Sequence, residues 1–536
     1  MRLRETKMEV PLLVNDFLRR ASKLYGPSEA VVDGDKRFTW SEFNARVNQQ
    51  AHALLDAGIG KGDRVAIIAP NSHEFLETFY ATAAIGAVVV PMNYRLVPSD
   101  FEYMLEHSGS KVALVDAEFL HLVDEVRGGI NAVEHFIAIP YGDAEIVTGW
   151  TNYEDWIASQ PTTQPPDPGL DETDLLSINY TSGTTARPKG VMITHRNAYI
   201  NAYNFIAHLR ISQDDAEMWT LPMFHANGWG GPYAITAMGG KHVVLRAPEA
   251  ADIYQVIQDE HCTFACMAPA VLARILEFER KDEYEITVKP RFTVAGAPPP
   301  QSFIERLEKE LGWEFIQIYG LTETSPILTV SEVAPFLNAD EDGYFGTKVR
   351  AGHDVIGVEV KVVRDSGREV AWDDEEVGEV VARSNVVLRG YWEQQEETNK
   401  VIVDGWFHTG DMATVNAEGY INIVDRAKDV IISGGENISS IEVEDVLYDH
   451  PAVLEAAVIG IPSEQWGETP LALIVPREGH AVTRDDIVAH CRSNMAGFKI
   501  PRNVEFVETL PRTATGKLKK FELREAYWEG VEKRVN

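Results

Sequence analysis

The chain has 536 residues, more than one hydrophobic core usually serves, so we expect at least two domains. Hydrophobic residues make up 45% and charged residues 24% of the sequence, which excludes a chain dominated by disorder. The formal net charge is -33 at pH 7, and a field of that sign repels nucleic acid and anionic membranes. Any local cluster of basic residues is therefore informative, because an anionic ligand would need one.

The cysteines and the apolar runs bear on where the protein works. Cys262, Cys266 and Cys491 cannot all pair and lack CxxC spacing, so we expect reduced thiols. The N-terminal segment has no signal-peptide apolar region, and the longest apolar run, residues 84–92, is far shorter than the roughly 20 residues that span a bilayer. The terminal EKRVN matches no peroxisomal or retention address. We therefore expect a cytoplasmic protein with no stable membrane anchor and no nucleic-acid partner.

The first 130 residues alternate strand-like and helix-like segments. RVAIIA (64–69) is predicted to be a buried strand, EFLETFYATAAI (74–85) has helical spacing, and AVVVPM (87–92) and KVALVD (111–116) are further strands. This rhythm is typical of parallel sheets covered by helices, so the fold class is predicted to be α/β. The same pattern returns later at residues 241–246, 264–278 and 315–320.

A strand-like segment, DLLSINY (174–180), runs directly into YTSGTTARPKG (180–190), and a helix-like segment follows. The second stretch holds four Thr and Ser hydroxyls, two glycines, an arginine and Lys189, but no carboxylate. Backbone N–H groups and hydroxyls in such a loop cradle phosphate oxygens. The spacing does not match the Walker A pattern GxxxxGK[ST]. We therefore predict a phosphate-binding loop of another kind, the alternative being an ordinary surface loop rich in Gly and Thr.

The pattern of predicted elements changes from about residue 343, where short strand-like segments alternate with turns that contain Gly and Asp. A small α+β unit follows the segment DRAKDVIISGGENIS (425–439). We predict a large N-terminal domain, residues 1–426, of parallel sheets with a β-rich subdomain. A small mobile C-terminal domain, residues 427–536, would be joined to it by a hinge near 426–430.

Six further segments follow the phosphate loop in a fixed order: FHANGW (224–229), VAGAPPP (294–300), YGLTETSP (319–326), GWFHTGDMA (405–413), DRAKDVIISGGENIS (425–439) and PRTATGKLKK (511–520). Together with that loop they resemble the adenylate-forming superfamily, which includes acyl-CoA synthetases, firefly-type luciferases and the adenylation domains of peptide synthetases. The resemblance covers almost the whole chain and is strongest to fatty-acyl-CoA synthetases of the short- and medium-chain type.

The resemblance implies a two-step reaction. A carboxylate attacks the α-phosphate of ATP to give acyl-AMP and pyrophosphate, and the thiol of coenzyme A then displaces AMP. Such chemistry depends on positioning and on neutralising charge, which would explain a local set of donors in an acidic chain. The implied ligands are ATP, Mg²⁺, coenzyme A as co-substrate and a small-molecule carboxylic acid, and the implied assembly is a homodimer.

The nucleotide site implied by the resemblance has four parts. The residues expected to bind the β- and γ-phosphates are Thr181, Ser182, Gly183, Thr184, Thr185 and Lys189; in this loop Ala186 replaces a glycine common in the family. Glu323 and Thr181 are expected to bind Mg²⁺, and Thr322 to contact the α-phosphate. The residues expected to contact the adenine are Gly296, Ala297, Pro298, Gln317, Ile318 and Tyr319, and those expected to bind the ribose are Asp411 and Arg426. The alternatives are core packing for Tyr319 and a turn-forming role for Asp411.

The C-terminal motifs imply the moving part of the mechanism. Lys517 would bridge the carboxylate and the α-phosphate, and Lys428 occupies the family's hinge position. Gly434 and Gly435 would let the pantetheine arm of coenzyme A pass close to the backbone. Ile432 stands where some long-chain relatives carry a lysine. The neighbouring Lys519 and Lys520 are expected to be solvated helix charges.

The FHANGW segment implies the acyl site. His225 would lie between the acyl and thiol sites, and Ala226 and Trp229 would line the substrate. Trp229 either gates a long tunnel or caps a short pocket, and the sequence leaves both open. The identity of the acid is open as well.

Two other functions compete with a CoA ligase. One is an acyl-AMP ligase or an enzyme that loads a carrier protein, and the absence of a carrier-like domain after the lysine loop favours free coenzyme A. The other is a regulatory protein that binds nucleotide without chemistry. The presence of Lys189, Glu323, Asp411 and Lys517 argues against it. Nothing in the sequence points to luciferase activity.

Overall fold

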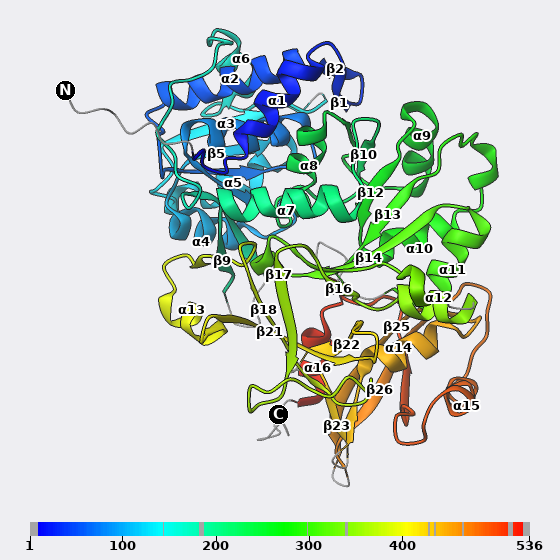
Figure 1. Cartoon of the computed structure of the whole chain (residues 1–536). Helices are drawn as coiled ribbons and strands as arrows, with labels where there is room; N and C mark the ends of the chain where they lie inside the picture. The colour runs from blue at the N-terminus through cyan, green and yellow to red at the C-terminus, as the bar shows by residue number, and fades with distance from the viewer. Residues whose placement is uncertain are drawn as a thin grey trace.

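The computed structural model describes residues 9–142, 144–181, 187–296, 299–337, 341–426, 429–433, 436–463, 466–512 and 518–528. Figure 1 shows two helix-covered sheets in the N-terminal part, a β-rich region beneath them and the C-terminal part at the bottom. This arrangement confirms the predicted α/β class, with a large N-terminal part of parallel sheets and a small α+β C-terminal part. No helix in the described ranges is both long and apolar enough to cross a bilayer.

The first sheet contains the strands predicted near the N-terminus. Within the described residues it has eight strands in the order β19-β9-β8-β4-β3-β5-β6-β7, parallel in the middle. β4 is buried at every position, as expected of a parallel strand covered on both faces. The strands are β3 (Arg64–Ile68), β4 (Val88–Met92), β5 (Ser110–Asp116), β6 (His135–Ile139), β7 (Thr151–Asn152), β8 (Leu175–Thr181), β9 (Lys189–Thr194) and β19 (Gly390–Tyr391).

The segment after the phosphate loop differs from its prediction. It is expected to be helix-like, but Lys189–Thr194 forms strand β9, which pairs antiparallel with β8. Helix α7 (His195–His208) begins only afterwards, where the Thr194 side chain accepts a hydrogen bond from Asn197 N in a capping box. The apolar GVMIT pairs with β8 before any helical periodicity starts. The predicted phosphate loop is therefore the connection of a β-hairpin.

The second sheet continues the parallel pattern in its middle and has antiparallel strands at both ends. Its nine strands, counted over the described chain, run in the order β16-β15-β14-β13-β12-β10-β11-β1-β2. They are β1 (Glu29–Asp33), β2 (Lys36–Thr39), β10 (Ala216–Trp219), β11 (Lys241–Val244), β12 (Phe264–Met267), β13 (Arg291–Val294), β14 (Glu314–Gly320), β15 (Ile327–Ser331) and β16 (His353–Asp354). β14 and β15 enclose the TETSP segment.

One hydrophobic cluster joins the two sheets. It includes Trp40 of α2, Phe79 of α3, Phe205 of α7 and Tyr233 of α8, together with strand residues from both sheets. These helices therefore pack between the sheets and fix their relative position. The helices of this part are α1 (Asn15–Tyr25), α2 (Trp40–Asp56), α3 (His73–Ile85), α4 (Pro98–Ser108), α5 (Leu120–Val126), α6 (Tyr153–Ala158), α7, α8 (Gly231–Met238), α9 (Ala250–Glu260), α10 (Pro269–Glu277), α11 (Gln301–Glu310), α12 (Glu341–Lys348) and α13 (Gln395–Val401).

The β-rich region begins later than predicted. Helix α12 occupies residues 341–348, and the antiparallel strands follow it. These strands are β17 (Val358–Val363), β18 (Gly378–Ser384), β20 (Ile402–Val403), β21 (Trp406–Val415) and β22 (Ile421–Arg426). The short strand β19 pairs with β9, which ties the β-rich region to the first sheet.

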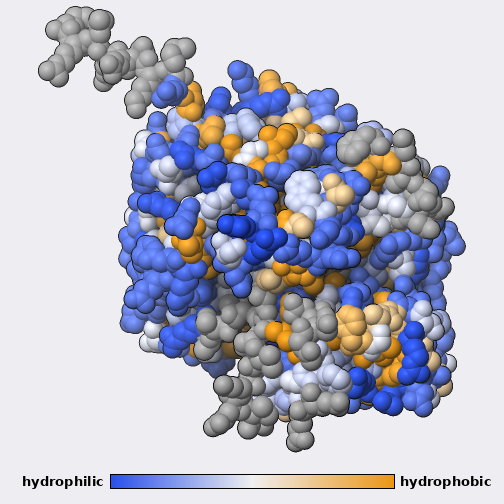
Figure 2. Space-filling model, turned by 60° about the horizontal axis from the view of Figure 1, so that its bottom comes forward, coloured by the Kyte–Doolittle hydropathy of each residue, from blue (hydrophilic) through white to orange (hydrophobic). Residues whose placement is uncertain are grey.

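The C-terminal part has its own small core. Ile431, Val443, Val458 and Ile474 belong to a cluster drawn only from residues beyond 430. Its elements are β23 (Ile431–Ser433), β24 (Glu436–Ile438), α14 (Ser440–Tyr448), β25 (Val453–Ser463), β26 (Gly467–Pro476), α15 (Arg484–Asn494), β27 (Asn503–Phe506) and α16 (Lys520–Trp528). Hydrophilic residues cover most of the face in Figure 2, with hydrophobic residues in small groups. The exact domain boundary and the hinge stay predictions.

Candidate active site

The β8–β9 hairpin brings two predicted phosphate-binding residues together. Thr181 and Lys189 are directly opposite in the antiparallel ladder, where Cα atoms lie roughly 4.5–5.5 Å apart. The other loop residues of the prediction, Ser182, Gly183, Thr184 and Thr185, lie outside the described residues, as does Ala186.

Lys189 faces an acid that the sequence analysis missed. Its Nζ lies 2.5 Å from Glu397 Oε2, on α13, and 5.0 Å from the ring centroid of Tyr391. Hydrogen bonds from Lys189 and Lys400 lower the pKa of Glu397 to about 2. The carboxylate is therefore ionised, and a phosphate approaching Lys189 would have to share or displace it.

Glu323, the predicted magnesium ligand, lies in a short 3-10 turn after β14. Its Oε1 accepts a hydrogen bond from the Tyr391 hydroxyl at 3.0 Å, and its backbone oxygen accepts one from Leu388 N at 2.7 Å. Burial and the charge of Glu323 raise the pKa of Tyr391, so the phenol stays protonated and donates. Tyr391 thus lies between Glu323 and Lys189. It belongs to the GYW segment after Arg389, which carries no recognised motif.

The predicted ribose residues also meet. The Tyr319 hydroxyl donates to Asp411 Oδ2 at 2.8 Å, and Arg426 Nε lies 3.4 Å from Asp411 Oδ1. Asp411 and Arg426 are cross-strand partners on β21 and β22. Burial, followed by the charge of Asp411, raises the pKa of Tyr319 well above its usual value. The hydroxyl of Tyr319 is therefore engaged by Asp411, and only its ring is left to stack.

The predicted adenine residues within the described chain lie on β14 and just after β13. Gln317 pairs with Val294, and Gly296, with φ of 95°, follows two residues after that strand end. Ile318 packs its side chain into the core between the sheets, so only its backbone can face a nucleotide. Ala297 and Pro298 lie outside the described residues.

The FHANGW segment forms a left-handed turn just before α8. The φ angles are 48° at Ala226, 53° at Asn227, 58° at Gly228, 56° at Trp229 and 91° at Gly230. Non-glycine residues in this conformation cost roughly 1–2 kcal/mol each. The turn is held by successive backbone bonds from 228, 229 and 230 back to 225, 226 and 227. Such strain persists only where the surrounding structure enforces it.

Contacts around Trp229 hold the left-handed backbone of the turn in place. Its side chain is buried in the main hydrophobic cluster, and its backbone oxygen accepts a hydrogen bond from Asn201 Nδ2 at 3.0 Å. Asn201 Oδ1 in turn accepts a bond from Ile327 N, at the start of β15. His225, which precedes the turn, is half-buried and donates its backbone N–H to Pro222 O. The turn is thus held by α7 and, through Asn201, by the start of β15.

Several predicted residues of the C-terminal part, namely Lys428, Gly434, Gly435 and Lys517, lie outside the described residues. The expectation for Lys520 is wrong, because only 12% of its side chain is exposed to solvent. Its Nζ lies 2.8 Å from Glu444 Oε1 and 2.5 Å from Ser440 Oγ. Lys519 is more exposed and pairs with Glu522. The KLKK run therefore mixes a surface lysine with a buried one, which the sequence alone does not reveal.

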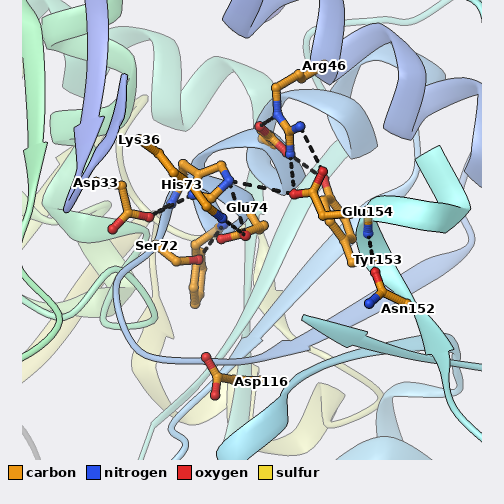
Figure 3. A network of polar contacts seen from close by, with 12 residues as sticks. Asp33, Lys36, Arg46, Ser72, His73, Glu74, Asp116, Asn152, Tyr153 and Glu154 are labelled. Carbon is orange, nitrogen blue, oxygen red and sulfur yellow. Dashed lines mark hydrogen bonds and ion pairs between the residues drawn. The ribbon is translucent and has the colours of Figure 1, made fainter. Parts of the chain in front are cut away.

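A second charged cluster lies at the start of α3, apart from all the motifs (Figure 3). His73 Nδ1 lies 2.7 Å from Asp33 Oδ2, and its Nε2 lies 3.1 Å from Glu74 Oε1. Burial alone would lower the pKa of His73, but Glu74, Asp33 and Glu154 outweigh burial and raise that pKa to about 10. Lys36 also lies 3.6 Å from Glu74. The spacing of Asp33, His73 and Glu74 would admit a metal, but a protonated histidine makes the cluster an ion-pair network.

Comparison with known proteins shows strong similarity along the chain. It is 36% identical to the peroxisomal trans-cinnamate:CoA ligase of Petunia hybrida, over 96% of this chain and 94% of that protein. It is 36% identical, with the same coverage, to 4-hydroxybutyrate–CoA ligase 2 of Metallosphaera sedula. Among solved structures, the anthranilate CoA ligase in complex with anthranoyl-AMP superposes with a TM-score of 0.88 at 28% identity, covering 98% of this chain and 99% of that one.

The relatives also correct the expected location. The petunia protein and several Arabidopsis thaliana relatives, at 33% to 36% identity, are named peroxisomal. The cytoplasmic location predicted from reduced thiols and from the terminal residues is therefore wrong. Reduced cysteines do not separate these compartments, since they exclude only an oxidising one.

Two family profiles match the chain in order. The profile described as AMP-binding enzyme matches residues 18–392, and the profile described as AMP-binding enzyme C-terminal domain matches residues 442–517. The first alone covers well over half of the chain. Together with the solved structures, these matches confirm the adenylate-forming resemblance: the chain belongs to the AMP-binding enzyme family.

Proposed function

We propose that this chain is an AMP-forming carboxylate–CoA ligase, which converts an acid, ATP and coenzyme A into an acyl-CoA, AMP and pyrophosphate. The observation that carries the proposal is a continuous set of contacts from Lys189 through Tyr391 to Glu323. Tyr319, bonded to Asp411, stands four residues before Glu323 on the same strand and turn. A phosphate side and a ribose side of one nucleotide site thus lie at the two ends of a short segment.

Adenylation uses the residues around Glu323. Thr181 and Lys189 hold the β- and γ-phosphates with the loop between them, and Thr322 holds the α-phosphate. Glu323 fits a magnesium ligand, because one oxygen accepts the Tyr391 hydroxyl and, within the described part of the chain, no hydrogen bond engages the other. Mg²⁺ would neutralise charge on the phosphates of ATP. Tyr391 orients the Glu323 carboxylate and remains a neutral donor.

Asp411 positions the nucleotide through the ribose. A buried carboxylate accepts two hydroxyl bonds well, and Tyr319 and Arg426 already fix the orientation of this one. The ring of Tyr319 stacks on adenine, while Gly296 and the backbone of Ile318 form the wall beside it.

Thioester formation requires a change in the C-terminal part. We propose that Lys517 serves adenylation and that the part beyond residue 426 then rotates about a hinge containing Lys428. Gly434 and Gly435 then admit the pantetheine arm, with His225 between the acyl and thiol sites. Ser439 and Ser440, at the start of α14, bond to Val424 and Asp425 of β22. These bonds across the junction support a state in which the two parts are docked.

The acid is short. The relatives are named for cinnamate, 4-hydroxybutyrate, and acetate or butyrate. Trp229 is 4% exposed and stands in a fixed turn. The acids of the relatives and the burial of Trp229 support Trp229 as a cap on a short pocket rather than the gate of a long tunnel. The family also suggests a homodimer.

The test is AMP release by the purified protein with ATP, Mg²⁺ and acids of two to sixteen carbons, with and without coenzyme A. Release that needs both acid and coenzyme A, with a short acid preferred, is the expected result. Acid-dependent pyrophosphate exchange without any CoA thioester would instead identify an acyl-AMP ligase or a carrier-loading enzyme. ATP binding without acid-dependent chemistry would identify a regulatory protein.

A further inference from the structure

A small internal cavity lies beside the left-handed turn of FHANGW. Its volume is about 10 Å³, and its lining includes Ala226, Asn227 and Gly230 of the turn. Thr322 and Ser325, on either side of Glu323, form another part of the wall. A space of this size holds about one water molecule.

The cavity gathers buried polar atoms that have no hydrogen-bond partner among the described residues. These are Asn179 Oδ1, Asn227 Oδ1, Tyr233 Oη and Ser325 Oγ. None of the four side chains belongs to a residue more than 7% exposed. Buried polar atoms are nearly always paired in native proteins, and each unpaired one costs about 1–3 kcal/mol. Four of them around one space indicate that a polar group binds there.

The two asparagines are oriented by a shared partner. Ser177 Oγ lies 2.9 Å from Asn179 Nδ2 and 2.8 Å from Asn227 Nδ2. A serine hydroxyl carries a single hydrogen, so at most one of the two amides can turn its oxygen towards it. At least one amide oxygen is therefore left as an acceptor for the cavity, together with two hydroxyls that can donate or accept.

The side chains that line the cavity determine which kind of ligand group it can bind. The residues that line the cavity in the described structure include no charged side chain. The cavity therefore disfavours a second carboxylate or an ammonium group, which would be buried without a counter-charge. A hydroxyl group suits it, because a hydroxyl donates one hydrogen bond and accepts up to two.

We propose that the preferred acid is a short hydroxy acid, whose hydroxyl, at the end remote from the carboxylate, binds in this cavity. The proposal rests on the proposed function, since it takes Thr322 as the residue beside the reacting carboxylate and phosphate. Only the hydroxyl enters the space of about 10 Å³, and the acyl chain lies on the Thr322 side of it. The hydroxyl replaces one water and can make up to three hydrogen bonds, donating to one amide oxygen and accepting from the hydroxyls of Tyr233 and Ser325.

The expected discrimination follows from those unpaired atoms. A site built to bond a hydroxyl can reject the analogue without it by as much as about 10⁴–10⁵, because its own groups are then left unpaired. Here a water can return to the cavity and reduce the penalty. We therefore expect a preference of roughly 10- to 100-fold in kcat/KM.

The experiment compares two acids of nearly equal size, 4-hydroxybutyrate and pentanoate, which differ by a hydroxyl in place of a methyl group. AMP formation by the full chain is measured with each acid, ATP, Mg²⁺ and coenzyme A. We expect kcat/KM to be at least tenfold higher for 4-hydroxybutyrate. Tyr233→Phe, which removes one hydroxyl from the cavity, should reduce that preference severalfold by lowering only the value for the hydroxy acid.

The matched control is Tyr80→Phe. Tyr80 is a buried neighbour whose ring centroid is 5.9 Å from that of Tyr233, but its hydroxyl is already paired with Pro232 O. This variant should leave the ratio of the two acids unchanged. Ser325→Ala provides a second removal of an unpaired hydroxyl and should act in the same direction as Tyr233→Phe.

The outcomes distinguish a failure of the proposed CoA ligase function from a failure of the hydroxy-acid inference. If no acid supports AMP formation, the proposed function fails. If acids are activated but pentanoate equals or exceeds 4-hydroxybutyrate, the CoA ligase stands and the inference is overturned, the cavity then holding water alone. If Tyr233→Phe and Ser325→Ala lower both acids equally, these hydroxyls do not bind the substrate hydroxyl, and the inference is overturned as well.

Discussion

The ammonium of Lys189 and the carboxylate of Glu397 form an ion pair of 2.5 Å between strand β9 and helix α13. The positive charge assigned to phosphate binding thus already has a partner. Glu397→Gln should lower the KM for ATP two- to fivefold, because the phosphates no longer compete with a carboxylate. Lys189→Met should raise that KM roughly tenfold or more through the lost charged hydrogen bond.

Glu396→Gln is the control for the pair, since Glu396 is exposed and adjacent, and Lys189 pairs with Glu397 rather than with Glu396. Steady-state kinetics with varied ATP measure all three variants. A higher KM in Glu397→Gln would mean that the acid aligns Lys189 for phosphate instead of competing for it.

Tyr391 should control the response to magnesium. Tyr391→Phe removes the hydrogen bond to Glu323 and keeps the ring, so we expect the half-saturating Mg²⁺ concentration to rise several-fold. The expected loss in kcat/KM is about tenfold, equivalent to roughly 1.4 kcal/mol. Tyr344→Phe, which breaks a Tyr–Glu bond of 3.1 Å to Glu308 elsewhere, should leave the magnesium response unchanged. An unaltered magnesium titration in Tyr391→Phe would show that Glu323 needs no help from this phenol.

Asp411 and Tyr319 should act as one unit on the nucleotide. Asp411→Asn is expected to raise the KM for ATP more than Tyr319→Phe, which loses a bond to Asp411 but keeps its ring. Since the two side chains touch, the double variant should be less impaired than the sum of the single effects. A double-mutant cycle on kcat/KM for ATP measures the coupling, and strict additivity would contradict a shared role.

Lys520 should support the C-terminal part. Lys520→Met leaves Glu444 buried without its partner, and breaking a buried pair in this way costs about 3 kcal/mol. We expect a clear fall in the thermal unfolding midpoint, with little change for Lys519→Met at the exposed neighbour. Adding Glu444→Gln to Lys520→Met should restore part of the loss. Equal midpoints for the two lysine variants would mean that the buried pair contributes nothing.

The network at His73 should make stability depend on alkaline pH. Its pKa is raised to about 10 in the folded chain, against about 6.5 when unfolded. A raised pKa stabilises fully below about pH 6.5, and that contribution fades as pH climbs to about 10. The wild type should therefore lose more thermal stability than His73→Gln between pH 6 and 10. Parallel curves for the two proteins would show that His73 is neutral throughout.

The sequence predicts well those strands and helices that show a continuous local pattern of apolar residues. Strands β3, β4 and β5 and helix α3 lie within a residue or two of their predictions, because each is a buried run or a clear helical period. The error at β9 arises because a short apolar strand and the start of a helix look alike over six residues.

The site is predicted where residues belong to a motif and missed where they enter through tertiary contact. Asp411, Tyr319 and Arg426 all come from motifs and lie in contact, while their roles in nucleotide binding stay predictions. Glu397 and Tyr391 come from a segment with no recognised motif, and only the pairing of β19 with β9 brings them to Lys189. Lys520 looks like any surface lysine, since its burial depends on α14 packing beside α16.

The left-handed backbone from Ala226 to Gly230 limits how the acyl preference can be redesigned or drift in evolution. β-Branched residues are poorly tolerated at positive φ, so valine or isoleucine at position 229 would disturb the turn itself as well as the pocket. Asparagine, glycine and unbranched side chains are the accessible replacements. A combinatorial library for altered substrates would therefore gain more from residues on the regular strands and helices, such as 179 and 233, than from the turn.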